Sequence, residues 1–518
     1  MKPAILCACL LVPILVSAAS YGVRSYGAKG DGKSKDTAAI QAAIDSAAKA
    51  GGGVVLLPAG TYLSGTLHLR SDITIELSAG ATLAASRDRA DFAAYETLPF
   101  KPVDDEETAY FRYALLAGEN LRRVSIRGPG TVDGNRDKRG GPKPLAFKNC
   151  ERVSIRGLTI RDAPNYAISL LGSSDVDIDG VSILNGYSDG IDPDCSRFVR
   201  ISNCYIDSAD DAVCLKTSQA LGRPQPTEHV TVTNCVLRTN QNHFKLGTES
   251  RGAFRNIALS NCTMLERDAG RPSRSGITIS SVDGAGIDGV AISNVVMRHG
   301  GAPFFLRLGN RGRGLNPPAP GSLRNVSLSN IVAEGGAIAS SIAGLEGHPV
   351  RNISLADLNL TMSGGGAATG GEVPEAAGQY PQAAMFGPLP AYGLYARHVE
   401  GLSVRNLAVR WVRPDPRPAL AFDDVASFDL SGFRFDSAAG PQPVLWFHHA
   451  MGGLVSGCRV GREIPLFLRV TGARSKDIGI AGNDLRLALR MVDLTAGANY
   501  AAAALSGNLV RGRLSPID

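Results

Sequence analysis

Three carboxylates stand in two short turns of this 518-residue chain. Asp189 lies in the first turn, and Asp210 and Asp211 lie side by side in the second, 21 residues after Asp189. That separation is about one coil of a β-solenoid, whose repeats take roughly 20 to 50 residues. Because the strands of successive coils stack at roughly 4.8 Å, two turns one coil apart would gather all three carboxylates into one cluster.

Such a cluster can do acid–base chemistry. Like-charged carboxyl groups repel one another, so the pKa of at least one of them should rise. A protonated carboxyl beside an ionised one is the pair that hydrolyses glycosidic bonds. The alternative is that Asp-Gly and Asp-Asp are ordinary turn residues here, since aspartate favours turns. The elements that would carry the two turns help to decide between these interpretations.

A repeat runs through the chain from about residue 120, in the form apolar-x-apolar-x-(Asn or Gly)-apolar-x-apolar. Its punctuating residues tolerate a left-handed backbone, so each copy predicts two strands that meet at a one-residue bend. A series of antiparallel hairpins is the alternative, but it does not explain the fixed position of the bend. We therefore expect an all-β chain, folded as one right-handed parallel β-helix over residues 20–518. The bend residues on which this prediction rests are Gly157, Gly180, Asn203, Asn234, Asn261, Asn294, Asn330, Asp357, Asn406 and Gly432.

Polar residues follow the bends at similar distances in four successive coils, which favours a cleft over scattered turns. Lys216, Lys245 and Arg274 are candidate ligands for a substrate carboxylate, although each could instead be a solvated surface charge. His243 could orient a carboxylate or the substrate, or could be a histidine in a surface turn. Glu249 remains open between a turn residue and a substrate contact. The predicted site is Asp189, Asp210 and Asp211 for catalysis, with Lys216, Asn242, His243, Lys245 and Arg274 for substrate binding.

The N-terminal residues carry two further signals. Residues 1–19 resemble a signal peptide, with Lys2 before an apolar run and small residues at 17–19, which predicts a secreted or periplasmic protein. A buried N-terminal strand is the alternative. Residues 36–50 have helical spacing with Asp36 as a possible N-cap, and a helix there would cover the open end of the first coil.

Composition restricts the partners. The chain is 44% hydrophobic and 20% charged, so it can bury a large core. A net charge of +6 suits an acidic substrate, whereas the lack of a Lys/Arg run argues against nucleic acid. No hydrophobic stretch after the leader is long enough to span a membrane. The histidines are scattered along the sequence, so we expect no metal site. We also expect no cofactor, and we expect the protein to be a monomer.

Seven cysteines follow the leader, and their odd number predicts buried thiols instead of a disulfide framework.

Four motifs carry a resemblance to the polygalacturonase family, glycoside hydrolase family 28. Residues 187–190 (Tyr-Ser-Asp-Gly) are similar to the family's Asn-Thr-Asp-Gly, and residues 209–211 (Ala-Asp-Asp) with Lys216 are similar to its double-aspartate motif. The family's Gly-His-Gly is altered, since Asn242 falls on the histidine. Its Arg-Ile-Lys is replaced by Gly-Ile-Thr-Ile at residues 276–279. Residues 26–32 also match, and the resemblance is best over residues 21–360.

The resemblance implies a secreted, inverting hydrolase of α-linked galacturonate in pectic polysaccharide. By motif position, Asp210 would be the general acid, and Asp189 and Asp211 would hold and activate water. Residues 96–111 form a candidate wall at one side of the cleft, which would favour cleavage from a chain end. Galacturonan and rhamnogalacturonan both remain possible substrates. A calcium-dependent lyase of the pectate type is one alternative, because the three aspartates could bind Ca²⁺. A non-catalytic, carbohydrate-binding β-solenoid is another.

Overall fold

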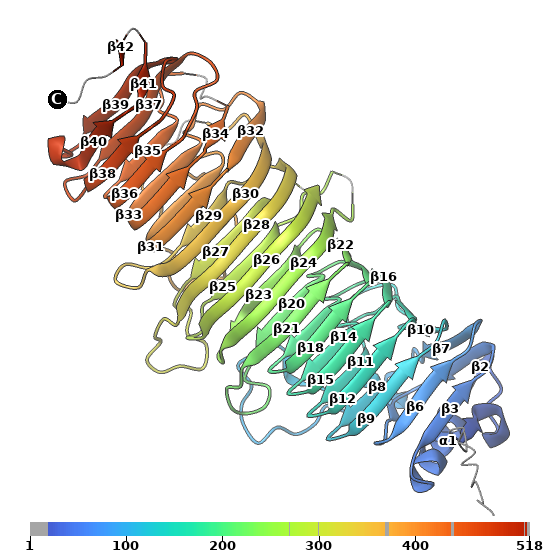
Figure 1. Cartoon of the computed structure of the whole chain (residues 1–518). Helices are drawn as coiled ribbons and strands as arrows, with labels where there is room; N and C mark the ends of the chain where they lie inside the picture. Colours follow the sequence, from blue (N-terminus) through green and yellow to red (C-terminus); the bar gives the residue numbers. More distant parts are fainter. Residues whose placement is uncertain are drawn as a thin grey trace, which may run out of the picture.

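The computed structural model describes residues 19–268, 270–298, 300–367, 372–436, 440–511 and 513–514. The predicted signal peptide at 1–19 lies outside the described residues, apart from Ala19. The chain winds into one elongated coil whose strands run side by side from end to end (Figure 1). Every strand pairing between coils of the described residues is parallel, and the crossover rule for parallel strands makes the coil right-handed. The predicted right-handed parallel β-helix is confirmed.

Each coil contributes to three stacked columns of strands. The first, which we call the cleft column, carries the turns with the predicted catalytic aspartates. Its strands are β5 (Leu67–His68), β8 (Ala114–Glu119), β11 (Lys143–Lys148), β14 (Ile168–Leu171), β17 (Ile191–Asp194), β20 (Val213–Thr217), β23 (Asn242–Ser250), β25 (Ser275–Ser281), β27 (Ala302–Leu308), β29 (Ser340–Ala343), the first part of β31 (Leu394–Arg405) and of β33 (Leu420–Ser431), β35 (Leu445–His448), β37 (Ile464–Thr471) and β39 (Ala488–Thr495).

The other two columns close the coil. The second column comprises β1 (Ser20–Gly22), β3 (Gly53–Leu57), β6 (Ile73–Leu77), β9 (Arg122–Arg127), β12 (Glu151–Arg156), β15 (Ser174–Asp179), β18 (Arg197–Ser202), β21 (Thr227–Thr233), β24 (Phe254–Leu265), β26 (Gly286–Arg298), β28 (Ser322–Gly336), β30 (Val350–Gly364), β36 (Met451–Ser456), β38 (Lys476–Ala481) and β40 (Ala503–Ser506), with the second parts of β31 and β33. The third comprises β2 (Asp31–Lys35), β4 (Gly60–Ser64), β7 (Ala81–Ala85), β10 (Thr131–Asp133), β13 (Thr159–Arg161), β16 (Ser182–Gly186), β19 (Tyr205–Ser208), β22 (Val236–Arg238), β32 (Ala408–Arg413) and β34 (Arg434–Phe435), with the ends of β24, β26, β28 and β30.

The bends between the second and third columns are built as the repeat predicts. All ten predicted bend residues have a positive φ, between 50° and 69°. Asparagines at this position also stack as hydrogen-bonded amides. Asn294 donates to Asn261 over 2.9 Å, and Asn330 donates to Asn294 over 2.8 Å. The bend residue therefore serves twice, because asparagine accepts the left-handed backbone and its side chain links one coil to the next.

Residues just inside each bend fill the core. Cys204, Cys235 and Cys262 follow their bend residues and are buried, and none of the seven cysteines outside the leader forms a disulfide. The apolar positions of all three columns meet in one continuous core along the molecule. The prediction of buried thiols is confirmed, and the bend repeat thus sets both the turn and the packing of the coil.

The helix α1 (Thr37–Lys49) covers the first coil, as predicted, and packs its apolar face against it (Figure 1). Asp36 holds the N-cap position, but its side chain does not cap the helix. Its carboxylate instead accepts hydrogen bonds from the amides of Lys29 and Gly30, at 2.7 and 3.0 Å. Asp36 thus occupies the predicted N-cap position, but its carboxylate binds the amides of the preceding loop instead of those of the helix.

Few other elements interrupt the coil. They are the short helices η1 (Val23–Tyr26), η2 (Arg89–Asp91), α2 (Glu106–Ala109) and η3 (Tyr500–Ala502), and the antiparallel pair β41 (Leu509–Val510) and β42 (Arg513–Leu514). In the described part of the chain, no helix has the length and apolar character needed to cross a membrane. Two connections between strands are long. One precedes β8 and contains α2, and the other joins β30 to β31 and is described except for residues 368–371.

Candidate active site

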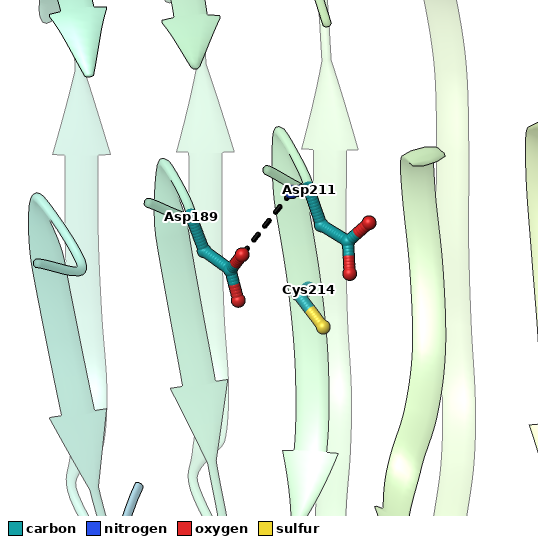
Figure 2. Close-up of side chains that lie close together, drawn as sticks. All are labelled: Asp189, Asp211 and Cys214. Atoms are coloured by element: carbon teal, nitrogen blue, oxygen red, sulfur yellow. Dashed lines mark hydrogen bonds between the residues drawn. The ribbon is translucent and has the colours of Figure 1, made fainter. Parts of the chain in front are cut away.

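Asp189 and Asp211 occupy the same place on neighbouring coils. Each lies two residues before its strand in the cleft column, and the strands β17 and β20 are in register through Ile191 and Val213. The amide of Asp211 donates to Oδ1 of Asp189 over 3.1 Å, as the dashed line in Figure 2 marks. Asn242 takes the equivalent place on the next coil, because Phe244 pairs with Val213. The coil length read from the sequence thus brings these side chains together.

Asp211 is held from two sides. Asn242 donates its side-chain amide to Oδ1 over 2.6 Å and its main-chain amide over 3.0 Å. Lys245 Nζ lies 2.7 Å from Oδ2. Burial alone would raise the pKa of Asp211, but the Lys245 ammonium and the Asn242 hydrogen bonds outweigh it and lower that pKa. Asp211 is therefore kept ionised, which is what a base requires.

For Asp189, the effects that raise the pKa outweigh those that lower it. Burial and the neighbouring Asp192 raise its pKa well above the usual range, against the attraction of Lys216. Lys216 Nζ lies 2.8 Å from Oδ2 of Asp189 and 2.5 Å from Oδ2 of Asp192. The pKa of Asp192 is raised to about 6, again mainly by burial. One ammonium group contacts two buried carboxyl groups, so the ionisation of each carboxyl group affects that of the other.

Lys216 is almost completely buried, 3% exposed, and its ammonium lies 3.8 Å from the centre of the Tyr166 ring. Its charge is compensated inside the protein. Asp192 lies within β17 and is the second carboxylate partner of Lys216. Asp194 has a structural role, since it accepts hydrogen bonds from the amide and hydroxyl of Ser218.

Asp210 points to a different partner. Arg139 Nη1 lies 2.6 Å from its Oδ2, and the amide of Asp211 lies 3.1 Å from its Oδ1. The same arginine holds Glu107 through Nε at 3.0 Å and Nη2 at 2.5 Å, and Ser188 donates to Glu107 over 3.1 Å. Glu107 is in α2, so the connection before β8 reaches the catalytic turns.

A cavity of about 180 Å³ opens over these groups. Lys216 and Lys245 line it, as do the three predicted catalytic aspartates. Sequence reasoning missed several of its lining residues, because they lie in connections that do not follow the repeat. Glu249, left open by the sequence, lines the cavity too. Its pKa is lowered to about 2, since Lys216 and Arg313 outweigh its burial. The additional lining residues are Asp105, Arg139, Tyr166, Thr248, Arg311, Arg313 and Tyr380.

Three predicted substrate ligands, Asn242, His243 and Arg274, are absent from the cavity lining, and Asn242 contacts Asp211 instead. His243 is fully buried, with Nε2 2.8 Å from the carbonyl oxygen of Leu265 and Nδ1 3.2 Å from that of Ser275. Arg274 is exposed and is absent from the cavity lining, so the predicted convergence of Arg274 with the two lysines is wrong. The residue in register with Lys245 is Thr278, because the connection before β25 is longer than the count from the bend assumed.

Asp189, Asp211 and Cys214 lie close enough together to share a cation (Figure 2). The chemistry of the set does not suit calcium, which takes six to eight oxygen ligands. Cys214 instead donates to the carbonyl oxygen of Gly247 over 3.1 Å, and burial raises the pKa of its thiol well above the usual range. Both carboxylates already contact lysine ammonium groups. These contacts disfavour the calcium-dependent lyase.

Comparisons with known proteins agree with this geometry. Over 367 residues the chain is 25% identical to "Probable polygalacturonase" from Vitis vinifera, covering 65% of this chain and 73% of that protein. It is 25% identical over 339 residues to "Exo-poly-alpha-D-galacturonosidase" from Dickeya chrysanthemi, covering 54% of this chain and 55% of that protein.

The fold has a solved counterpart in the family 28 exopolygalacturonase of Yersinia enterocolitica. The TM-score is 0.57 at 20% identity, with 82% of this chain and 76% of that chain covered. The family model described as "Glycosyl hydrolases family 28" matches residues 52–377, which include every residue of the cavity except Tyr380. The chain therefore belongs to glycoside hydrolase family 28.

Proposed function

We propose that this glycoside hydrolase cleaves α-linked galacturonate residues of pectic polysaccharide with inversion at the anomeric carbon. The observation that carries the proposal is a pair of adjacent carboxyl groups in the cavity, Asp210 and Asp211, whose surroundings differ. The pKa of Asp211 is lowered, and Asp210 stands next to it with a different set of partners. Asp210 then gives its proton to the leaving oxygen, while Asp211 takes one from the attacking water and Asp189 holds that water. An inverting site needs about 6.5–9.5 Å between its two carboxyl groups for the water to fit.

The cationic groups of the cavity support a uronate substrate. Lys245, Arg139, Arg311 and Arg313 all line it. Arg311 is oriented by the carbonyl oxygen of Thr248 at 2.9 Å, and Arg313 by Glu249 at 2.7 Å. Guanidinium groups held in this way bind carboxylates with little loss of conformational freedom. The polygalacturonase relatives point to the same class of substrate.

We further propose cleavage from a chain end. The connection containing α2 is anchored at two points, because Glu107 binds Arg139 and Asp104 accepts a hydrogen bond of 2.8 Å from the amide of Gln219. Its residue Asp105 lines the cavity. A wall fixed at two points would block one side of the cleft and leave room for a terminus of the polymer.

Product analysis tests the reaction. With an oligogalacturonide substrate, proton NMR before mutarotation should detect the β-anomer of the released sugar. Appearance of the α-anomer first, or of an unsaturated product that absorbs in the ultraviolet, would falsify inverting hydrolysis. For the mode of attack, chromatography should show one short product from the earliest times. A ladder of intermediate lengths would contradict cleavage from the end.

We also propose that the protein is exported and that residues 1–19 are removed. The charged start, the apolar run and the small residues at 17–19 support this. Mass spectrometry of the protein from its native source should give an N-terminus near residue 20. An N-terminus at Met1 in exported material would contradict it.

A further inference from the structure

A second and larger cavity, of about 480 Å³, lies on the C-terminal coils. It is formed by β31, β33 and β35 together with the connection between β30 and β31. Its lining includes Trp446, His398, Glu375, Asp424 and Arg397. None of these residues belongs to the active-site cavity, and the family match ends at residue 377, before most of them.

This cavity lies on the same face of the coil as the active site. Strand register runs in one line from Lys245 through Thr278, Phe305, Ser341, Tyr395 and Ala421 to Trp446. Six strand-to-strand steps separate Lys245 from Trp446, which is about 29 Å at roughly 4.8 Å a step. The connection after β30 contributes to both places, since Tyr380 lines the active site and Glu375 lines the second cavity. Phe305, Tyr395 and Ala421 on this line are buried in the apolar cluster beneath that connection, so the two cavities are separate sites on one face.

The polar groups of the second cavity are held in place before any ligand arrives. His398 bridges two carboxylates, with Nδ1 2.6 Å from Asp424 and Nε2 2.9 Å from Glu375. Arg397 Nη2 lies 2.7 Å from Glu375. Convergent polar groups with fixed orientation in a hollow are the usual construction of a binding site for a small polar ligand.

Trp446 adds an aromatic surface. Its ring is half-buried and packs against the apolar cluster beneath the connection after β30. Its Nε1 donates to the hydroxyl of Thr471 over 2.9 Å, so the ring is fixed in orientation. An aromatic ring that borders a polar hollow offers an apolar surface to the C–H face of a sugar, while the carboxylates accept hydrogen bonds from its hydroxyls.

The charge of this cavity determines which class of sugar it can bind. Five carboxylates line the cavity, namely Glu346, Glu372, Glu375, Asp423 and Asp424, against the two guanidinium groups of Arg397 and Arg474. Both arginines are paired internally, Arg397 with Glu375 and Arg474 with Asp424 at 3.2 Å. A uronate would meet a surplus of negative charge, whereas hydroxyl groups suit carboxylate acceptors. We propose that this cavity is a second carbohydrate-binding site that takes neutral sugar residues.

The two tryptophans of the chain make the test direct. Trp411→Phe leaves Trp446 as the reporter, and Trp446→Phe leaves Trp411, which lies on β32 in the third column. Each protein is titrated with a neutral β-1,4-linked galactotetraose while the fluorescence is followed. We expect a saturable change in Trp411→Phe and none in Trp446→Phe. No saturable change in Trp411→Phe, or the same change in both proteins, would overturn the proposal.

Two further experiments test where the ligand binds and which ligand charge the cavity prefers. In the Trp411→Phe background, Asp424→Asn should weaken binding of galactotetraose by about tenfold, since hydrogen bonds to charged groups are the strong ones. A tetragalacturonate titrated into Trp411→Phe with Asp210→Asn should leave the Trp446 signal unchanged. A stronger response to the uronate than to the neutral sugar would reject the assignment. Because binding is read without turnover, this result is independent of the proposed hydrolysis, and Trp446→Phe should hydrolyse short oligogalacturonides at the wild-type rate.

Discussion

Arg139 contacts Asp210 across 71 residues of sequence, with Nη1 2.6 Å from Oδ2. The same guanidinium binds Glu107 in α2. One side chain thus links the proposed general acid to the wall of the cleft. The contact also covers the oxygen from which Asp210 would give its proton. A substrate that draws Arg139 towards its own carboxylate would uncover that oxygen, so we expect uronate binding and acid catalysis to be coupled through this residue.

Asp210→Asn should reduce kcat by about 10²–10⁴-fold, the usual contribution of a general acid. The fold should survive, because asparagine keeps the shape of the side chain. Steady-state kinetics on oligogalacturonide would measure the effect. Asp207→Asn is the matched control, since Asp207 is bound by Arg238 and Arg267 outside the cavity and its variant should keep wild-type kcat. Wild-type activity in Asp210→Asn would place the acid elsewhere.

Arg139→Gln should lower kcat/KM on uronate oligomers by about tenfold, because a charge-assisted hydrogen bond is lost from both Asp210 and Glu107. Arg136→Gln is the control, since Arg136 lies in the same connection but donates to the carbonyl oxygens of Asn135 and Ser86. Equal losses in the two variants would show that the connection as a whole is sensitive, and that Arg139 has no special role.

Lys245→Met should move the acid limb of the pH–rate profile to higher pH. Lys245 holds the pKa of Asp211 down, so its removal raises that pKa, and the base is then protonated over a wider acid range. Activity should fall most at low pH and recover as the pH rises. The profile of kcat/KM measures this shift, because it reports the ionisation of the free enzyme. An unshifted limb would mean that Asp211 is not the base.

Lys216→Met should destabilise the protein by about 3–5 kcal/mol near neutral pH, the usual cost of leaving buried charges unpaired. Lys216 lies against Asp189 and Asp192, so we expect an effect on stability more than on substrate binding. Both carboxyl groups then have folded-state pKa values above their unfolded values. Groups of this kind contribute stability below the unfolded pKa and lose it as pH rises. Urea unfolding at several pH values should therefore show the smallest difference from wild type in acid.

The residues Asn203, Asn234 and Asn261 show how much of this molecule its sequence determines. An apolar alternation that meets a residue tolerant of positive φ at a fixed position favours a repeating coil, and the coil length then stacks Asp189 on Asp211. Both follow from local backbone sterics and from a regular spacing. The helix over the first coil follows in the same way, since its apolar spacing and its position at the end of the coil are both visible in the sequence.

Tertiary structure alone decided how the site is completed. Arg139 and Tyr380 line the cavity from connections outside the repeat, Glu107 binds Arg139, and no periodic signal marks such contacts. The same reason explains Arg274, because one longer connection shifted the register and brought Thr278 beside Lys245 instead. The charge state of each carboxyl group depends on burial and on which lysine lies beside it, and both are properties of the packed coil.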